Sequence, residues 1–281
     1  MRFRYIMLFS LFLFCFGNRL FGQTVNARQL DDAISSGNVT IVSANGTGYI
    51  TTVSGRLRNN TANEIQINVI INNGVYFSNS GSGQNMLALA ILMANNEYYS
   101  SGTTKYIILP ANATENITFK AYCTDRAKDA PKQNETLTRN NMPAGLRSIA
   151  AKLSNYHAEN FDKDTGRIIQ LALWREQRES IADIASIFDF SEKEWSDSSY
   201  ILGVSDVHAR VVPGTYSYNS SYTVGITGDG FAMSWEGNTY RGTYMVIGNT
   251  LILKSTEGKK FIFTIVNNAI QDREGDNWPR R

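Results

Sequence analysis

Between residues 39 and 123, apolar and polar residues alternate in the pattern of β-strands that expose one face. Residues 49–58 and 64–71 both show this alternation, and the turn-forming residues 59–63 lie between them. Two alternating segments joined by a short polar turn predict a β-hairpin. Several strands of this kind within one segment predict an immunoglobulin-like β-sandwich.

Two further segments complete the predicted sandwich. Residues 86–93 are apolar without interruption, which suits either a helix or a buried strand, and the strands around them favour a strand. Residues 117–123 alternate again, and one face of this strand carries Ile117, Phe119, Ala121 and Cys123. We expect that face to lie in the core, with the thiol of Cys123 buried.

Helical spacing of apolar residues replaces the alternation between about residues 143 and 202. Helices are predicted around Leu146, Ile149, Ala150 and Leu153, around residues 168–174, around Ile181, Ile184, Ala185 and Phe188, and around Trp195. Because the connections are short, we expect these helices to pack as one cluster against the sandwich. The chain is therefore predicted to be mainly β with a helical insertion, an α+β fold.

The helix predicted at residues 165–174 is apolar on nearly all sides, which is typical of a helix buried in the middle of a domain. The polar residue inside its apolar run is Gln170. A buried amide without hydrogen-bond partners costs about 1–3 kcal/mol, so Gln170 needs a partner. We expect that partner at Cys123.

Strand-like alternation returns after residue 213, with turn residues every few positions. The strands between these turns are predicted at residues 223–226, 231–235, 243–247, 250–254 and 260–266. They form an antiparallel meander, and closure into a small β-barrel is the simplest way to hide its edges. The predicted domains are thus residues 23–205, a sandwich with its helical segment, and residues 210–281, a barrel or meander.

Residues 1–22 have the pattern of a secretory signal peptide, because Arg2 and Arg4 precede an apolar run too short for a membrane span. We therefore expect a secreted or extracytoplasmic protein, in the periplasm or at the cell surface, with no transmembrane span in the mature chain. Removing these residues lowers the formal net charge from +2 to −1, since they carry Arg2, Arg4 and Arg19 and no acidic residue. A near-neutral chain gives no electrostatic reason to predict nucleic-acid binding.

Two short motifs carry the most distinctive chemistry of the mature chain. Tyr122 and Cys123 end a predicted strand, and Gln170, Ala172 and Trp174 lie on the predicted central helix. In order and composition these motifs resemble the thioester domains of bacterial surface adhesins, which carry an aromatic-Cys motif and a Thr-Gln-x-Ala-apolar-Trp motif. The resemblance covers roughly residues 39–205, and it implies covalent capture of an amine through a thioester at Cys123.

The match to the thioester domains is incomplete. Ile169 stands where that family has threonine, and the later glutamine motif that supplies the acyl group has no counterpart, since Gln177 and Gln271 lack apolar neighbours. The alternative is that the two motifs pack a strand end against a helix. With Cys15 in the signal peptide, Cys123 has no disulfide partner, and such a cysteine is most often a small buried hydrophobe.

Other residues with catalytic or metal-binding chemistry are scattered along the chain. Asp162, Asp164 and Gly166 resemble the beginning of a calcium loop, but Ile168, Ile169 and Leu171 after them supply no side-chain oxygen. His157 and His208 lack a ligand cluster at metal spacing, and we expect both to be surface or boundary residues. The sequence shows neither a nucleophile elbow nor a glycine-rich phosphate loop. We predict no catalytic residue, no metal and no cofactor.

The predicted C-terminal barrel is rich in aromatic residues with a polar edge, which are common where proteins contact sugars or other surfaces. Those predicted to bind ligand are Tyr216, Tyr222, Trp235, Tyr240 and Tyr244. The alternative is that they alternate between the core and single exposed positions. In its turn spacing this segment resembles the small lipocalin-like β-modules of secreted bacterial proteins.

These features predict an exported, non-enzymatic binding or adhesion protein at or outside the cell surface, with a surface glycan or a protein as its partner. Two alternatives stay open. One is a thioester-type covalent adhesin centred on Cys123 and Gln170, and the other is a small-ligand carrier that uses the C-terminal barrel. The sequence indicates no oligomeric state.

Overall fold

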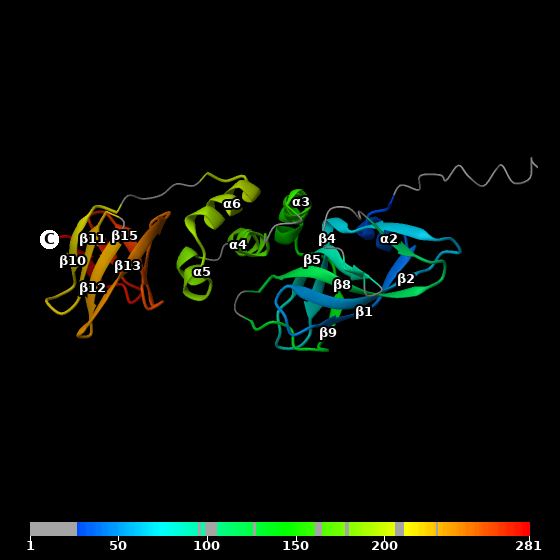
Figure 1. Cartoon of the computed structure of the whole chain (residues 1–281), viewed down its shortest axis with the longest axis horizontal. Coiled ribbons are helices and arrows are strands. Elements are labelled where there is room, and N and C mark those ends of the chain that lie inside the picture. The colour runs from blue at the N-terminus through cyan, green and yellow to red at the C-terminus, as the bar shows by residue number, and fades with distance from the viewer. Residues whose placement is uncertain are drawn as a thin grey trace, which may run out of the picture.

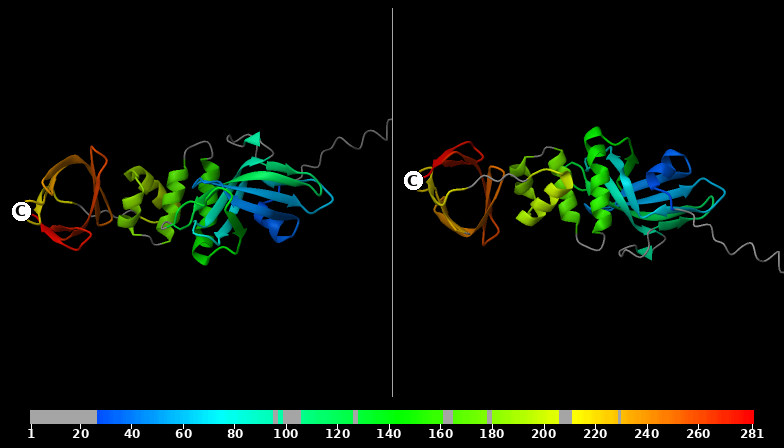
Figure 2. Two further views of the ribbon diagram at one scale, coloured as in Figure 1. Left: turned by 90° about the horizontal axis from the view of Figure 1, so that it is seen from below. Right: turned by 90° about the horizontal axis from the view of Figure 1, so that it is seen from above.

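The computed structural model describes residues 27–94, 97–98, 106–125, 128–160, 165–177, 180–205, 211–228 and 230–281. The protein is mainly β, with helices between two sheets that each curve into a barrel (Figure 1, Figure 2). The predicted mainly β, α+β class is confirmed. The predicted signal peptide at residues 1–22 lies outside the described residues.

The N-terminal barrel follows the short helix α2 (Leu30–Ser35) and has its strands in the order β4-β9-β1-β2-β8-β5-β6. These are β1 (Val39–Gly46), β2 (Thr52–Asn59), β4 (Ile70–Asn79), β5 (Met86–Ala94), β6 (Glu97–Tyr98), β8 (Thr114–Cys123) and β9 (Thr136–Arg139). An additional pairing joins β4 to β5, so the sheet closes on itself. Because the strands run in one continuous sheet, the predicted immunoglobulin-like sandwich of two sheets is not confirmed.

The strand predicted at residues 64–71 is divided in the structure, and neither half pairs with β2. Its first half, β3 (Ile65–Asn68), pairs with β7 (Tyr106–Leu109), while β2 pairs with β1 and β8. The predicted hairpin is therefore wrong. The reason lies in Asn59, whose buried side-chain amide donates hydrogen bonds to backbone carbonyls in the turn and at the end of β7. These bonds hold the start of β3 against β7.

Strand β5 is buried on both faces, which explains its unbroken apolar sequence. Met86, Ala88 and Ile91 face the barrel interior, whereas Leu87 and Leu89 face the helices. The prediction of a strand at this position is confirmed. On the neighbouring strand β8, the face predicted to lie in the core does so as well.

The helices are α3 (Ala144–Glu159), α4 (Gly166–Glu176), α5 (Ile181–Ile187) and α6 (Glu192–Leu202), and all lie where helical spacing predicted them. Helix α4 is at the centre, and its residues from Ile169 to Trp174 are all buried. Ile169, Ala172 and Leu173 pack against α3 and the outer face of β5 and β8. Leu171 and Trp174 pack towards α5 and α6, in an apolar cluster that also includes Ile247 and Ile252 of the C-terminal barrel. The prediction of a buried central helix is confirmed.

The C-terminal barrel is antiparallel, and each strand pairs with the next along the chain. Its strands are β10 (Gly214–Ser217), β11 (Thr223–Thr227), β12 (Gly230–Trp235), β13 (Asn238–Ile247), β14 (Thr250–Ser255), β15 (Lys260–Val266), β16 (Ala269–Gln271) and β17 (Asn277–Pro279). A bridge between Tyr216 and Arg280 brings the first strand to the last. The predicted barrel is therefore confirmed, and the predicted division at residues 205–210 falls between α6 and β10.

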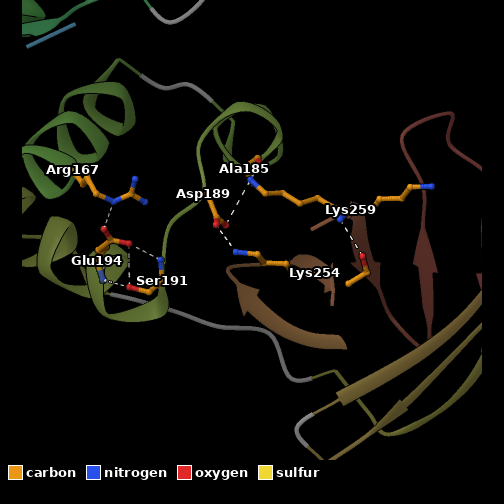
Figure 3. A network of polar contacts seen from close by, with 9 residues as sticks. Arg167, Ala185, Asp189, Ser191, Glu194, Lys254 and Lys259 are labelled. Atoms are coloured by element: carbon orange, nitrogen blue, oxygen red, sulfur yellow. Dashed lines mark hydrogen bonds and ion pairs between the residues drawn. The ribbon is translucent and has the colours of Figure 1, made fainter. Parts of the chain in front are cut away.

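Helix α5 packs on the C-terminal barrel, a contact that the sequence did not predict. Ile184 of α5 shares an apolar cluster with the outward-facing barrel residues Ile247 and Ile252. Beside this cluster the carboxylate of Asp189 forms an ion pair with Lys254 (Figure 3). The helices thus contact both barrels. Within the described residues, none of the helices combines the length and the apolar character that a membrane span requires.

Candidate functional site

Two hydrogen bonds join the end of β8 to the middle of α4. Oε1 of Gln170 accepts a hydrogen bond from the backbone N–H of Cys123 at 3.0 Å, and Nε2 of Gln170 donates to the backbone carbonyl of Cys123 at 2.7 Å. Gln170 is 4% exposed and Cys123 is 1% exposed, so both bonds are shielded from water. The prediction that Gln170 finds its partner at Cys123 is confirmed.

The position of this contact follows from the lengths of the strands. Strand β2 pairs with β8 only as far as Lys120, while β5 pairs with β8 up to Cys123. Beyond Lys120, the backbone of β8 therefore has β5 on one edge and no strand partner in the described sheet on the other. Gln170 supplies the donor and the acceptor that a neighbouring strand would have provided.

The thiol of Cys123 belongs to the interior of the N-terminal barrel. Its Sγ lies 3.4 Å from the carbonyl oxygen of Ile50 and 3.7 Å from Sδ of Met86. Burial raises the pKa of Cys123 to about 12, and the negative charge of Asp125 adds to the increase. The thiol is therefore protonated at neutral pH, whereas the thiolate is the nucleophilic form.

None of the glutamines considered as acyl donors directs its amide at this sulfur. Both polar atoms of the Gln170 side chain are engaged by the backbone of Cys123. Gln177 donates to the carbonyl of Leu173 at 3.4 Å, and Gln271 donates to the carbonyl of Gly275 at 2.8 Å. The two hydrogen bonds between Gln170 and Cys123 hold the end of β8 against α4, which agrees with the packing interpretation of the two motifs.

His157 is buried in α3, so its predicted position at the surface or at a boundary is wrong. It follows Leu153 by four residues and thus continues the apolar face of that helix. Its ring meets the ring of Tyr122 edge-on, with the centroids 6.4 Å apart. Burial lowers the pKa of His157 to about 4, and the charge of Lys120 contributes to the decrease.

The remaining residues considered for catalysis or metal binding are only partly within the described chain. Asp162, Asp164 and His208 lie outside the described residues. Gly166 begins α4, and the residue before it, Thr165, makes no side-chain hydrogen bond at the helix start. Among the described residues, no three histidine, cysteine or acidic side chains are grouped so as to hold a metal ion.

The aromatic residues predicted to bind ligand all pack on the core of the C-terminal barrel, and these are Tyr216, Tyr222, Trp235, Tyr240 and Tyr244. Trp278 lies among them and is 1% exposed. It stacks on Trp235 with the ring centroids 5.6 Å apart and the planes 9° apart, and Phe263 meets it edge-on at 5.3 Å. Large side chains therefore occupy the space that a carrier needs for its ligand.

The polar tips of two of these tyrosines are engaged by the backbone. The hydroxyl of Tyr216 donates to the carbonyl of Val212, and that of Tyr244 donates to the carbonyl of Gly228, both at 2.6 Å. Tyr216 and Tyr240 are buried, while Tyr222, Trp235 and Tyr244 are partly buried. The alternation between core and partly exposed positions describes these residues better than a single binding face does.

The outer face of the N-terminal barrel has an open hollow of about 340 Å³, which no motif in the sequence indicates. It lies over β1, β2 and β8, and β5 forms one side. These strands are neighbours in the sheet, in the order β1-β2-β8-β5 (Figure 1). Its lining consists of Ser43, Asn45, Ser54, Gly55, Arg56, Met93, Asn116, Ile117 and Thr118. Most of these side chains carry hydroxyl, amide or guanidinium groups, and Arg56 is the charged residue of the lining.

The strand register explains how these polar residues come together. Ser54 of β2 pairs with Asn45 of β1 on one side and with Thr118 of β8 on the other. Two residues further along β2, Arg56 pairs with Ser43 and with Asn116 in the same way. The residues thus form two parallel rows across three strands. Each strand shows two polar residues at alternate positions in the sequence, but only the order β1-β2-β8 places the pairs side by side.

Comparisons of the chain with protein-family models, with curated proteins and with solved structures found no match.

Proposed function

We propose that the chain is an exported, non-enzymatic binding or adhesion protein that acts at or outside the cell surface and holds its ligand non-covalently in the polar hollow of the N-terminal barrel. The basic and apolar pattern of residues 1–22 supports export. The observation that carries the proposal is the hollow itself. A volume of about 340 Å³ falls within the range of ligand-binding clefts.

The side chains of the hollow are available to a ligand. Within the described part of the chain, those of Asn45, Arg56, Asn116 and Thr118 form no hydrogen bond or ion pair with the protein. The hydroxyl of Ser54 donates to the carbonyl of Asn45 at 3.2 Å and still has acceptor capacity. A convergent set of polar groups without internal partners is the usual means of orienting a bound molecule.

The thioester alternative receives less support from the surroundings of Cys123. A thioester requires Sγ of Cys123 to approach the side-chain carbonyl carbon of a glutamine. Sγ contacts Ile50 and Met86 instead, and the Gln170 amide is bonded to the backbone of Cys123 rather than directed at its sulfur. Intact-mass spectrometry of the mature protein separates the two proposals. A mass equal to the sequence mass supports the non-covalent proposal, whereas a mass lower by one ammonia supports the thioester.

The hollow is tested by filling it. We expect the mature protein to bind a discrete set of ligands on an array of surface glycans and extracellular proteins. Ser54→Tyr should abolish that binding, because the new ring occupies the middle of the polar rows. Thr239→Tyr is the matched control, since Thr239 is an exposed strand residue of the C-terminal barrel. Equal binding by wild type and Ser54→Tyr would overturn the proposal.

A further inference from the structure

The layout of the hollow restricts the shape of its ligand. Neighbouring strands lie about 4.8 Å apart, and alternate residues on a strand lie about 6.8 Å apart. The two polar rows across β1, β2 and β8 therefore cover about 10 Å by 7 Å. Met93 of β5 pairs with Thr118 and extends one row by an apolar side chain. This is a small, shallow footprint in which polar groups are spaced at regular intervals.

The chemistry of the lining restricts the ligand further. The hydroxyls of Ser43, Ser54 and Thr118 and the amides of Asn45 and Asn116 can both donate and accept hydrogen bonds. A ligand that matches them carries several groups of the same dual kind, close together. Hydroxyl groups on a compact ring have this property. The lining contains no aromatic side chain, so its hydroxyl, amide and guanidinium groups are the ones that contact the ligand.

The electrostatics of the hollow favour a negative group on the ligand. Arg56 is exposed and belongs to the lining, which contains no carboxylate. Arg58 is exposed two residues further along, so the same face of β2 carries a second cation. A guanidinium binds carboxylate or sulfate oxygens through two parallel hydrogen bonds. Two arginines on one strand are far fewer than the basic stripe of a nucleic-acid site.

From these observations we infer that the hollow binds an acidic saccharide, a sugar or short oligosaccharide with a carboxylate or sulfate group. This inference rests on the proposed function of the hollow and adds the class of its ligand. The sugar hydroxyls bond the serine, threonine and asparagine side chains of the two rows, and the acidic group pairs with Arg56. Both the neutral and the charged parts of the lining are then used.

The experiment measures binding of the full mature chain to matched pairs of tetrasaccharides by calorimetry. One pair is tetragalacturonate and its methyl ester, and the other is a sulfated tetrasaccharide and its unsulfated form. We expect one acidic member to bind at least tenfold more tightly than its neutral partner. The pair that shows the difference tells whether the hollow prefers a carboxylate or a sulfate.

Variants connect this preference to the hollow. Arg56→Gln should weaken binding of the acidic ligand about ten- to a hundredfold and leave binding of its neutral partner unchanged. The reason is that a hydrogen bond between charged groups is replaced by a neutral one. Arg139→Gln is the matched control, because Arg139 is an exposed arginine of β9 outside the hollow. Raising the ionic strength should weaken binding of the acidic ligand more for the wild type than for Arg56→Gln.

The possible failures are distinguishable. If neither acidic tetrasaccharide binds, or if Arg56→Gln binds like the wild type, the inference is overturned. If neutral ligands bind and Ser54→Tyr abolishes their binding, the proposed function of the hollow stands and only the acidic class is wrong. If a saccharide binds equally to the wild type and to Ser54→Tyr, the hollow is not the site and both proposals fail.

Discussion

Replacing Gln170 by leucine removes the two hydrogen bonds between α4 and the end of β8, with little change in side-chain size. The variant leaves the backbone N–H and carbonyl of Cys123 without the partners they have at 3.0 and 2.7 Å. Both groups are buried, so water cannot replace the lost hydrogen bonds. A buried group left unpaired costs about 1–3 kcal/mol, and two such groups cost roughly 2–6 kcal/mol. The more hydrophobic leucine side chain offsets part of this cost.

The thiol of Cys123 provides a local measurement of this effect. In a chain that begins at residue 23, after the predicted signal peptide that contains Cys15, Cys123 is the single thiol, and its pKa of about 12 keeps it inert in the folded state. Labelling with iodoacetamide at pH 8 then reports opening of the end of the barrel. A destabilisation of about 3 kcal/mol should accelerate the labelling roughly a hundredfold.

Gln177→Leu is the matched control for this measurement. It makes the same substitution at the C-cap of the same helix, where the Gln177 side chain only donates a hydrogen bond to the carbonyl of Leu173 at 3.4 Å. We expect its labelling rate to stay within about threefold of the wild type, because changes at such sites are usually within about 0.5 kcal/mol. Labelling of Gln170→Leu at the wild-type rate would refute the idea that these two hydrogen bonds hold β8 to α4.

Three further predictions concern the packing around α4. Trp174→Ala should destabilise the protein by about 3–5 kcal/mol in chemical denaturation, since Trp174 is 7% exposed and its ring meets that of Phe188 edge-on with the centroids 5.4 Å apart. An unchanged free energy of unfolding would place Trp174 outside the core. The pKa of His157 is about 4 in the folded protein and near 6.5 when unfolded, so stability should fall by up to about 3 kcal/mol as the pH drops from 6.5 to 4. In His157→Gln this part of the pH dependence should vanish, and an unaltered pH profile would contradict the assignment. Asp189→Asn should cost at most about 1 kcal/mol, and 0.5 M salt should remove the difference from wild type, because the ion pair with Lys254 is half exposed.

The elements that were predictable from the sequence are those whose burial has a periodic pattern. Helix α4 is apolar on nearly all sides because it packs against α3 and the N-terminal barrel on one side and against α5 and α6 on the other. Strand β5 is uniformly apolar for the same reason, with one face in the barrel and one under the helices. The turn residues of the C-terminal meander mark strands that pair only with their neighbours in sequence. In each case the local sequence contains the information.

The parts that were not predictable depend on contacts between distant segments. The hairpin after β2 was predicted from its polar turn, but Asn59 binds the end of β7, about fifty residues later, and redirects the chain. Closure of the N-terminal sheet depends on the pairing of β4 with β5, which no alternation pattern encodes. The polar hollow likewise requires the neighbours β1, β2 and β8, so its residues look like ordinary exposed strand positions in the sequence.

The contact of α5 with the C-terminal barrel changes what an isolated barrel should do. Because each strand pairs with the next along the chain, a fragment of residues 209–281 should fold by itself. Its outer face, however, contains Ile247 and Ile252, which are 0% and 3% exposed in the full chain, where they share an apolar cluster with Ile184 of α5. Burying an isoleucine contributes about 1.5–3 kcal/mol, so the isolated barrel loses roughly 3–6 kcal/mol of stabilisation.

We therefore expect the fragment of residues 209–281 to show β-type circular dichroism, to melt at a lower temperature than the same barrel in the full chain, and to bind an apolar dye. Replacing Ile247 and Ile252 together by threonine should abolish dye binding, because it makes the exposed face polar without touching the aromatic core around Trp278. In the full chain the same double substitution should lower the melting temperature of the barrel towards that of the fragment. A fragment that melts like the full chain and binds no dye would show that α5 merely lies beside the barrel. An unfolded fragment would show instead that the barrel requires the helices, and that the domain boundary belongs before α5 rather than after α6.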